Sequence, residues 1–519
     1  MSHNGTSLSP VFVIDRNESK PLHRQVYDGY REAILRGDLV PGQKVPSSRE
    51  LASEIRVSRF PVLHAYAQLL AEGFFESQVG SGTFVSAALP EQVTPSDSRH
   101  TEDAEHAPSG HRPMAARNRL YPAFARDSHL RTGGSFGLHQ PACDQFPFNI
   151  WSGLVSRHSR NPWSTSLQRV DPMGLYRFRQ ELCRHLRTAR SVKCDPEQIM
   201  IVSGSQQALD ITARVLLDPG DAVLVEEPGY NLQRTLLEAA GCRLKLVPVD
   251  EQGMDIARAP RCEGVKAAFV TPSHQFPLGS TMSATRRLHL LNWAQREGAW
   301  IVEDDYDSDF RFDARPIASL QGLDVNARVI YIGTFSKILF PSLRIGYLVI
   351  PRDLVGHFEA VRYATDIFPP YLYQEALADF MEFGHLARYV RKMRRIYGER
   401  RNALIESIHA EFGDFFQVHG SSAGMHVSVT LPDGFNDVEI SARASSERLV
   451  LWPLSRYYTG EHPRHGFVLG FGATPTQHIP SAIKRLHTLI LGPARDSAFD
   501  YAARNLTVAD HLSLESRAS

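Results

Sequence analysis

A lysine that follows an apolar run stands among side chains able to hold a phosphate. Lys337 lies in "GTFSKILFPSLRIGY", with Ser336 directly before it and Arg344 seven positions after it. Residues 329–332 are apolar and rich in β-branched side chains, so they predict a strand that ends just before the lysine. Thr334 adds a second hydroxyl, and hydroxyls with a guanidinium form a phosphate cradle. An amine beside such a cradle indicates a Schiff base with pyridoxal 5'-phosphate (PLP).

Other segments meet the further demands of that cofactor. Its pyridine nitrogen needs a carboxylate to stay protonated, and "VEDDYDSDF" supplies Asp304, with Tyr306 available for the ring hydroxyl. Its phosphate needs backbone N–H groups at a helix start, which Ser205 and Gln206 offer in "SGSQQALD". Its ring needs an aromatic face, which Tyr230 offers in "EEPGYNLQR". Each motif alone is typical of a solvated turn, a loop or ordinary packing, but the four demands met together favour a PLP site.

The elements that must position these residues are strands that alternate with helices. The runs "IMIVSG", "AVLVEEP", "KAAFVTP", "AWIVEDD" and "RVIYIGTFS" are apolar and end in turns, and helices are expected between them, as at residues 206–217 and 285–297. Continuous apolar strands predict a mostly parallel sheet covered on both faces. Ligands of such sheets lie at the carboxyl ends of the strands, where the candidate residues fall. Residues 136–492 are therefore predicted to form an α/β domain.

The amino-terminal region carries a different pattern. Helices are expected at residues 23–36, 49–55 and 59–72, with Ser47 or Ser48 and then Ser58 as caps. Helix, tight turn and capped helix form a helix-turn-helix, whose second helix would present Arg59 to a guanine or a phosphate. "FFESQVGSGTFVS" predicts a two-stranded wing. A three-helix bundle without DNA fits the pattern equally well, because residues 1–86 carry as many basic as acidic side chains.

Composition sets the limits of the remaining predictions. The 519 residues exceed one ordinary domain, and 57 basic side chains balance 57 acidic ones, so net charge does not indicate nucleic acid. Residues 89–135 are polar and rich in proline and serine, which predicts a flexible linker, and residues 493–519 form a polar tail. Five scattered cysteines without a C-x-x-C pair predict reduced thiols and no metal site. The absence of a signal-peptide pattern and of a long apolar run predicts a cytoplasmic protein without a membrane segment.

The amino-terminal stretch closely resembles the GntR family of winged-helix regulators. "PSSRELASEIRVSRFPVLHAYAQLLAEGFFESQVGSGTFV" is similar to the family pattern almost throughout, except that Pro61 stands where threonine is usual. The resemblance implies a DNA-binding domain at residues 20–88. It also implies which residues approach double-stranded DNA: Arg49, Ser58, Arg59, Gly82 and Thr83.

Residues 136–492 resemble the fold type I, class I aminotransferases, with a mostly parallel large domain and an α/β small domain. The motifs are "VSGSQQALD", "VEEPGY", "TPSHQFPLGSTMS", "VEDDYDSDF" and "GTFSKILFPSLRIGY". The resemblance implies that Lys337 forms the Schiff base, that Asp304 pairs with the pyridine nitrogen, and that Tyr230 stacks on the ring. It also implies that Tyr306 contacts the ring hydroxyl. The phosphate would be held by four residues: Ser205, Gln206, Ser336 and Arg344.

The chain departs from the aminotransferase pattern at two positions. Phe276 stands where an asparagine contacts the cofactor, so His274 or Gln275 is a candidate substitute. Val468, in "GFVLGFGA", stands where an arginine binds the substrate α-carboxylate. Its absence argues against ordinary turnover of α-amino acids, unless one of two other arginines takes over: Arg456 or Arg464.

The order winged helix, linker and aminotransferase-like domain resembles the MocR subgroup of GntR regulators. The resemblance implies a homodimer that binds an operator with repeated half-sites. We expect a regulator that senses PLP, an amine or an amino acid. A regulator that senses PLP itself would govern the supply of vitamin B6. The alternative is an active aminotransferase with an appended DNA-binding domain.

Overall fold

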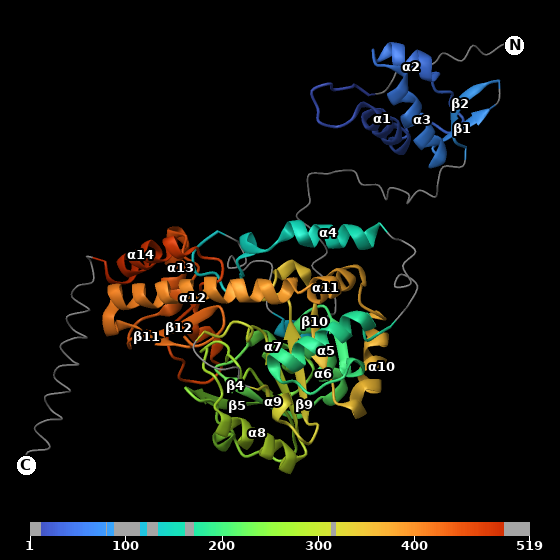
Figure 1. Ribbon diagram of the computed structural model, residues 1–519. Helices are drawn as coiled ribbons and strands as arrows, with labels where there is room; N and C mark the ends of the chain where they lie inside the picture. The colour runs from blue at the N-terminus through green and yellow to red at the C-terminus, as the bar shows by residue number, and fades with distance from the viewer. Residues whose placement is uncertain are drawn as a thin grey trace, which may run out of the picture. The chain divides into compact units, whose positions relative to one another are not determined.

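The computed structural model describes residues 12–78, 80–87, 115–121, 133–160, 171–312 and 318–492. The chain divides into two compact units, Met1–Pro113 and Met114–Ser519, which are described separately below (Figure 1). Among the described residues, no helix is both long and apolar enough to cross a membrane.

The first unit consists of three helices followed by a hairpin. Its elements are α1 (Leu22–Arg36), α2 (Ser48–Glu54), α3 (Arg59–Ala71), β1 (Phe75–Gln78) and β2 (Gly82–Val85), and the two strands pair antiparallel. Tyr30, Tyr66 and Phe75 hold helices and hairpin together, with ring centroids 5.2–5.7 Å apart in edge-to-face contacts. The predicted winged helix-turn-helix is confirmed.

Two predicted serines occupy N-cap positions in this unit, and only one of them caps through its side chain. Ser47 caps α2, because its hydroxyl accepts from the Glu50 amide at 3.3 Å while the Glu50 carboxylate accepts from the Ser47 amide at 2.8 Å. Ser58 occupies the N-cap position of α3, but its side chain makes no capping hydrogen bond. Ser58 is therefore confirmed as the N-cap residue of α3, without a side-chain capping bond. Its extended backbone still starts the helix.

The second unit is built on an eight-stranded mixed sheet. In spatial order the strands are β3 (Ile199–Val202), β10 (Gly346–Val349), β9 (Val329–Thr334), β8 (Trp300–Asp305), β7 (Val265–Val270), β4 (Ala222–Glu227), β5 (Arg243–Asp250) and β6 (Gly253–Met254). β10 runs antiparallel to both β3 and β9, and β6 runs antiparallel to β5. The other neighbouring pairs are parallel, which confirms the mostly parallel sheet.

Apolar side chains on both faces of this sheet explain its helical cover. Ile201 and Tyr331 enter one core, and their neighbours Met200 and Ile330 enter the core on the other face. The first face packs α5 (Tyr176–Arg190) and α8 (Ala284–Glu297), and the second packs α6 (Ser205–Leu216), α7 (Asn231–Ala239) and α10 (Val355–Asp366). The remaining helices of this part are α4 (Phe148–Ser159), α9 (Leu320–Leu323) and α11 (Leu372–Glu382).

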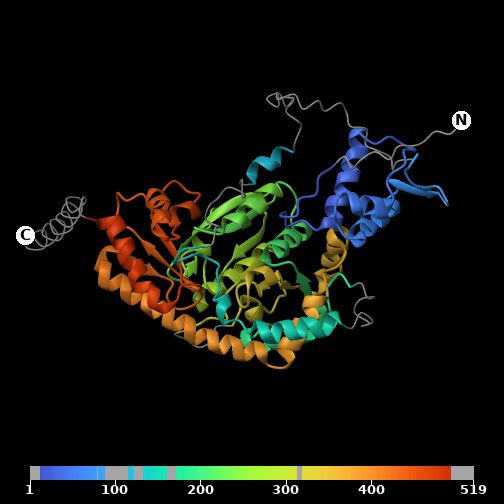
Figure 2. The same cartoon turned by 90° about the horizontal axis from the view of Figure 1, so that it is seen from above.

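A second, smaller sheet forms the predicted small domain. Its order is β11 (Gln417–His419), β12 (His426–Thr430), β14 (Gly466–Gly470) and β13 (Trp452–Pro453), all antiparallel. Three helices accompany it: α12 (His385–Phe412), α13 (Asp437–Ala444) and α14 (Ile479–Leu491). The long α12 connects the two parts, because it contacts α14 at one end and α11 at the other (Figures 1 and 2).

Most of the predicted linker and the whole predicted tail, residues 493–519, lie outside the described residues. Within residues 89–135, a 3-10 helix at Ala116–Leu120 contacts α7. Ser135 pairs with the chain beside Leu449: its amide donates to the Arg448 carbonyl, and its carbonyl accepts from the Val450 amide, both at 2.9 Å.

Candidate functional site

The candidate residues gather at the carboxyl ends of five strands of the large sheet, β9, β8, β7 and β4 side by side and β3 on the far side of antiparallel β10. Lys337 follows β9, Asp304 is the last residue but one of β8, and Tyr230 follows β4. Ser205 opens α6 directly after β3, and the loop of His274 to Gly279 follows β7. The fold therefore brings together segments that lie far apart in the sequence.

Lys337 lies in an environment that disfavours its charged form. Its side chain is partly exposed, yet the surrounding protein desolvates the ammonium and lowers its pKa from 10.5 to about 7. Asp307 and Asp304 oppose this shift, and the nearby Arg344 guanidinium adds to it. Near neutral pH a large fraction of this amine is therefore unprotonated, which is the form that attacks a carbonyl group.

Asp304 is displaced in the opposite direction. Desolvation, and then the neighbouring Asp305, raise its pKa from 3.8 to about 7, while Lys337 lowers it. Its Oδ1 atom is buried and has no hydrogen-bond partner. Such an atom costs free energy unless a donor reaches it, and a protonated pyridine nitrogen is a donor of the right kind. Glu226 lies close enough to contribute to the raised pKa of Asp304, and desolvation raises its own pKa to about 7.

Tyr306 is tied to a buried histidine–aspartate pair. His274 Nδ1 lies 3.0 Å from an Asp307 oxygen and 3.1 Å from the Tyr306 hydroxyl. Asp307 also accepts from the Met425 amide of the small domain at 3.2 Å. If His274 Nδ1 carries the proton and Asp307 holds it, the hydroxyl hydrogen of Tyr306 is free for an acceptor in the site. Of the two substitutes considered for the asparagine replaced by Phe276, His274 is the one joined to Tyr306.

Gln275 is instead engaged by its own loop. Its amide nitrogen donates to the carbonyls of Pro228 and Phe276 at 2.8 and 2.7 Å, and its oxygen accepts from Leu278 at 3.0 Å. Phe276 points its ring toward the tyrosines of the site, with centroids 5.8 Å from Tyr230 and 6.2 Å from Tyr306. An aromatic ring thus occupies the place where the family pattern has an amide.

The predicted phosphate ligands surround the β3–α6 turn. Arg344 donates to the Ser203 carbonyl at 2.6 Å. It packs so closely on Gly204 that a Cβ there would lie 2.9 Å from its Nη2. Ser205 begins α6 and directs backbone N–H groups toward the turn. The Ser336 hydroxyl and the Gln206 side-chain oxygen are buried without hydrogen-bond partners.

Thr334, predicted to contact the phosphate, is buried, and its hydroxyl already has partners within the protein. Its hydroxyl accepts from the Ser336 amide at 3.2 Å and lies 3.4 Å from the Ile345 carbonyl. It therefore shapes the loop that carries Lys337. Tyr230 precedes α7 and lies close enough to both Asp304 and Arg344 for their charges to affect its pKa, which desolvation raises.

These residues fit a phosphopyridoxal group. An unpartnered carboxylate oxygen at Asp304, a neutralised amine at Lys337 and an unpartnered hydroxyl at Ser336 match its ring nitrogen, its aldehyde and its phosphate. When bound, PLP supplies an electron sink for amine chemistry. Lys337 would then supply the attacking amine, Asp304 the counter-charge, and Ser336 with Arg344 part of the phosphate cradle.

Sequence reasoning missed two histidines of the site. His139, in a left-handed backbone conformation (φ 63°), lies with its ring 5.4 Å from Phe276. His426 on β12 lies with its ring 4.5 Å from His274. Desolvation lowers the pKa of both histidines, and the charge of Lys337 lowers both further. Neither follows a strand of the large sheet, so the pattern that revealed the other residues could not find them.

One cluster of side chains in the site is a possible metal site, although none was predicted from the sequence. His274, Asp307 and His426 each offer a ligand atom, and these atoms lie within 4.8 Å of one another. His274 Nε2 is buried without a hydrogen-bond partner. The three residues form a potential set of metal ligands. The sequence pattern did not reveal it, because the residues lie far apart along the chain.

The position of the missing carboxylate anchor is apolar. Val468 on β14 pairs with Ser428 and Trp452 and packs in the same core cluster as Phe276. Arg456 is exposed, and its carbonyl accepts from Asn231 at 2.9 Å. Arg464 is also exposed and lines a separate cavity of about 340 Å³ with Gly279, His419 and Gly420. The guanidinium that perturbs the Lys337 amine is that of Arg344.

The predicted DNA-binding residues lie on α2, at the start of α3 and in the hairpin of the first unit. Arg49 on α2 and both Ser58 and Arg59 at the start of α3 are exposed. Arg59 Nε donates to the Ser48 hydroxyl at 3.1 Å, and this bond links α3 to α2. Gly82 (φ +117°) and Thr83 lie in the hairpin, beside Lys44, which sequence reasoning did not single out.

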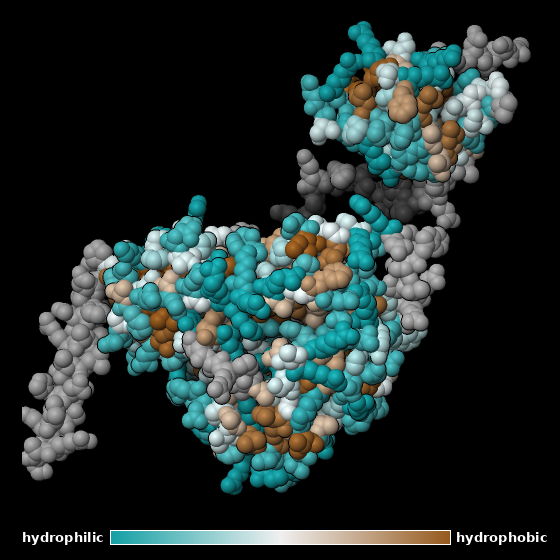
Figure 3. Space-filling model, in the orientation of Figure 1, coloured by the Kyte–Doolittle hydropathy of each residue, from teal (hydrophilic) through white to brown (hydrophobic). Residues whose placement is uncertain are grey.

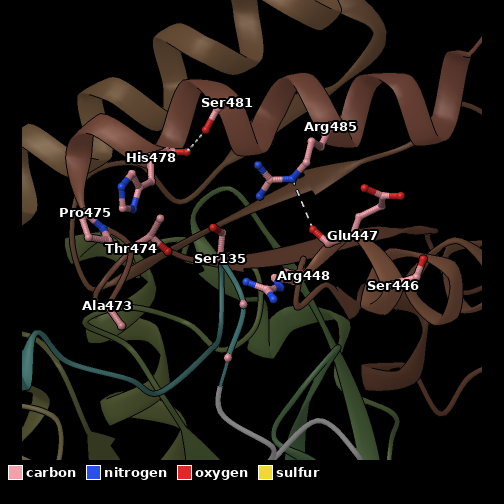
Figure 4. A pocket seen from close by; sticks show the side chains of 12 residues that line it. Ser135, Ser446, Glu447, Arg448, Ala473, Thr474, Pro475, His478, Ser481 and Arg485 are labelled. Carbon is pink, nitrogen blue, oxygen red and sulfur yellow. Dashed lines mark hydrogen bonds between the residues drawn. The ribbon is translucent and has the colours of Figure 1, made fainter.

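A further cavity of about 650 Å³ lies in the small domain, between the segment of Ser135 and the start of α14 (Figure 4). Arg485 donates to the Glu447 carbonyl at 3.3 Å, and Ser481 donates to the His478 carbonyl at 3.0 Å. This cavity contains none of the residues predicted for the cofactor.

Comparisons with known proteins agree with this geometry. Residues 164–453 match the family described as aminotransferase class I and II, and residues 22–85 match the bacterial regulatory proteins of the gntR family. The kynurenine aminotransferase of Pyrococcus horikoshii, solved in complex with PMP, is 28% identical with a TM-score of 0.64, over 72% of this chain and 98% of that chain.

Two curated relatives extend over nearly the whole chain. The probable rhizopine catabolism regulatory protein MocR of Rhizobium meliloti is 37% identical over 481 residues, 93% of this chain and 96% of the relative. The pyridoxine biosynthesis transcriptional regulator PdxR of Corynebacterium glutamicum is 30% identical over 463 residues, 89% of this chain and 94% of the relative. Fold and site thus define an aminotransferase-like protein with a helix-turn-helix unit. The chain belongs to the GntR family of regulators, in its MocR-type subgroup.

Proposed function

We propose that the protein is a PLP-dependent transcription regulator whose aminotransferase-like domain senses PLP, an amine or an amino acid at Lys337. The observation that carries the proposal is the lowered pKa of Lys337, about 7, beside the unpartnered Oδ1 of Asp304. An amine that is largely neutral near physiological pH can capture an aldehyde, and a buried carboxylate without a donor favours a cationic ring.

The residues of the site would each act in one step of recognition. Arg344, Ser205, Gln206 and Ser336 would hold the phosphate, Tyr230 would cover the ring, and Tyr306 would donate to its hydroxyl. Met425 and His426 belong to the small-domain side, and the Met425 amide reaches Asp307. A ligand at Lys337 would thus lie near Asp307, which links the two parts of the second unit. It can shift the protein between conformers, provided that its affinity for them differs.

Partners follow from the same proposal. We infer a homodimer that presents two helix-turn-helix units to repeated half-sites, since two-fold symmetry pairs them. One relative is named as a regulator of pyridoxine biosynthesis, which keeps PLP itself among the candidate effectors.

The second candidate function is an active aminotransferase with an appended DNA-binding domain. The complete set of predicted cofactor residues favours it. The apolar Val468 at the anchor position and the exposed positions of Arg456 and Arg464 disfavour it.

The test uses the full-length protein, Lys337→Ala, and Lys266→Ala as a matched loss of an exposed lysine. Each is incubated with PLP, reduced with borohydride and mapped by mass spectrometry. Duplexes selected from a random library by the wild-type protein then report DNA affinity with and without PLP. We expect the label on Lys337, and a PLP-dependent change of affinity in the wild type and Lys266→Ala only. Labelling elsewhere, or an unchanged affinity, would overturn the proposal.

A further inference from the structure

The solvent face of α3 carries an apolar stripe beside the exposed polar side chains of Arg59 and His64. Phe60 is 75% exposed, Leu63 43% and Leu70 37%, and Ala67 is also exposed between them. These positions are spaced by three, four and three residues, so they share one face of the helix. The opposite face is buried, because Val62, Ala65, Tyr66 and Leu69 enter the core of the unit. The stripe is therefore additional to the face that holds the fold together.

A surface helix ordinarily places charged and polar side chains on its outer face. In the described part of the first unit, Phe60, Leu63 and Leu70 belong neither to the core cluster nor to the side chains packed against it. Apolar patches among hydrophilic atoms are visible on the face of this unit that Figure 3 shows. The fold of the unit itself thus gives no reason for an exposed phenylalanine at this position.

The position of Phe60 indicates what covers it. α3 is the second helix of the helix-turn-helix, and the first residues of such a helix face the base edges in the major groove. Phe60 is its second residue, and Leu63 follows one turn later on the same face. Exposed side chains of both signs lie nearby in the sequence, Arg49, Arg56 and Arg59 with Glu50 and Glu54, so charge does not decide the occupant. Placement at the start of the second helix of a gntR-type helix-turn-helix, directly after Arg59, favours DNA.

Only one feature of the major groove is apolar. Thymine presents its C5-methyl group, whereas the other edges present hydrogen-bond donors and acceptors, and phenylalanine is among the side chains that contact this methyl. Neither Phe60 nor Pro61 can donate a side-chain hydrogen bond, so Arg59 is the donor in the first turn of α3. Leu70 lies ten residues from Phe60, about 15 Å along the helix, which places it away from the first-turn contacts.

We propose that Phe60, assisted by Leu63, determines operator specificity by contacting thymine methyl groups next to the base pair that Arg59 approaches. The inference rests on DNA binding by the first unit and adds the chemical feature that is read. Removing one methyl from such a contact should weaken binding about fourfold, the equivalent of about 0.8 kcal/mol for a buried methylene-sized group.

The experiment replaces thymine by deoxyuridine, which removes only the methyl group. Duplexes are first selected from a random library by the full-length protein, and single thymines of each half-site are then exchanged. We expect a loss of about fourfold at one or two positions per half-site for the wild type. Phe60→Ala should bind the thymine and deoxyuridine duplexes equally. Arg59→Ala should lower affinity while keeping the preference for thymine, and Leu70→Ala is the control that keeps both.

The outcomes separate this inference from DNA binding itself. Failure to enrich any duplex would contradict DNA binding, and with it the proposed function. Enrichment of sites that tolerate deoxyuridine everywhere would overturn the role of Phe60 alone. A Phe60→Ala protein that keeps the thymine preference, or that changes its oligomeric state instead, would also overturn it.

Discussion

Lys337 and Asp304 reach nearly the same pKa from opposite directions. Desolvation lowers the pKa of the amine to about 7 and raises that of the carboxyl group to about 7, because burial disfavours the charged form of each. The charge state of each group is therefore balanced near neutral pH, where a small change in its surroundings alters the protonated fraction.

The balance predicts the pH dependence of labelling at Lys337. Below its pKa the ammonium is unreactive, and above it the neutral amine attacks acylating reagents, so labelling should rise through pH about 7. Cofactor-free protein is labelled with trace acetic anhydride between pH 5 and 10 and digested for mass spectrometry. Exposed Lys266 provides the reference in the same sample. A Lys337 midpoint near pH 10.5 would contradict the desolvated environment.

The turn between β3 and α6 predicts the effect of a single added methyl group. Gly204 has a φ of +94°, and a Cβ at this position would lie 2.9 Å from Arg344 Nη2. Gly204→Ala should therefore displace the guanidinium and lower PLP affinity about tenfold or more, since a lost hydrogen bond to a charged group costs about 1.5–3 kcal/mol. Affinity is measured by titrating absorbance with PLP.

Gly220→Ala is the matched control for that change. Gly220 has a similar φ of +97°, but no atom lies within 4 Å of its added Cβ. Both substitutions strain the backbone, and only one disturbs Arg344. Equal affinities in the two variants would show that Arg344 does not hold the phosphate.

At the scale of elements, the capping box of α2 predicts a local loss of stability. Ser47→Ala removes the hydroxyl that accepts from Glu50, and loss of such a cap costs about 1 kcal/mol. Amide hydrogen exchange in α2 should then accelerate about fivefold, because it reports local opening. Ser58→Ala should leave exchange in α3 nearly unchanged, since its hydroxyl makes no capping bond. Equal acceleration in both variants would contradict the assignment of the cap.

Local pattern was sufficient for some elements and not for others. β3, β4, β7, β8 and β9 are continuous apolar runs, and the site residues that follow them were predicted for that reason. The insertion of antiparallel β10 between β3 and β9 was not predicted, because spatial order depends on long-range pairing. His139 and His426 were missed because distant segments bring them to Phe276, and no local signal marks them.

At the scale of the whole molecule, the two units combine a ligand site with a DNA-reading helix in one chain. Thermodynamic coupling between them is reciprocal: a ligand that changes DNA affinity must have its own affinity changed by DNA to the same extent. A regulator needs only this coupling and binding at Lys337. An enzyme additionally needs its substrate held for proton transfer.

That difference predicts slow or absent turnover of ordinary α-amino acids by the PLP-loaded protein. Transamination requires the α-proton to face the lysine, and a carboxylate anchor supplies much of that orientation. Val468 offers only a buried apolar surface at the aligned position. Exchange of the amine at the cofactor does not itself need the anchor, so spectral change without conversion is the expected result.

Single-turnover assays measure pyridoxamine phosphate formed from amino acids and from their decarboxylated amines as matched pairs. Amines should perturb the spectrum at least as strongly as the amino acids, because position 468 offers no guanidinium to bind the carboxylate. Rapid and complete conversion by any common α-amino acid would contradict the regulator proposal and favour an active aminotransferase, with Arg456, Arg464 or a partner subunit supplying the anchor.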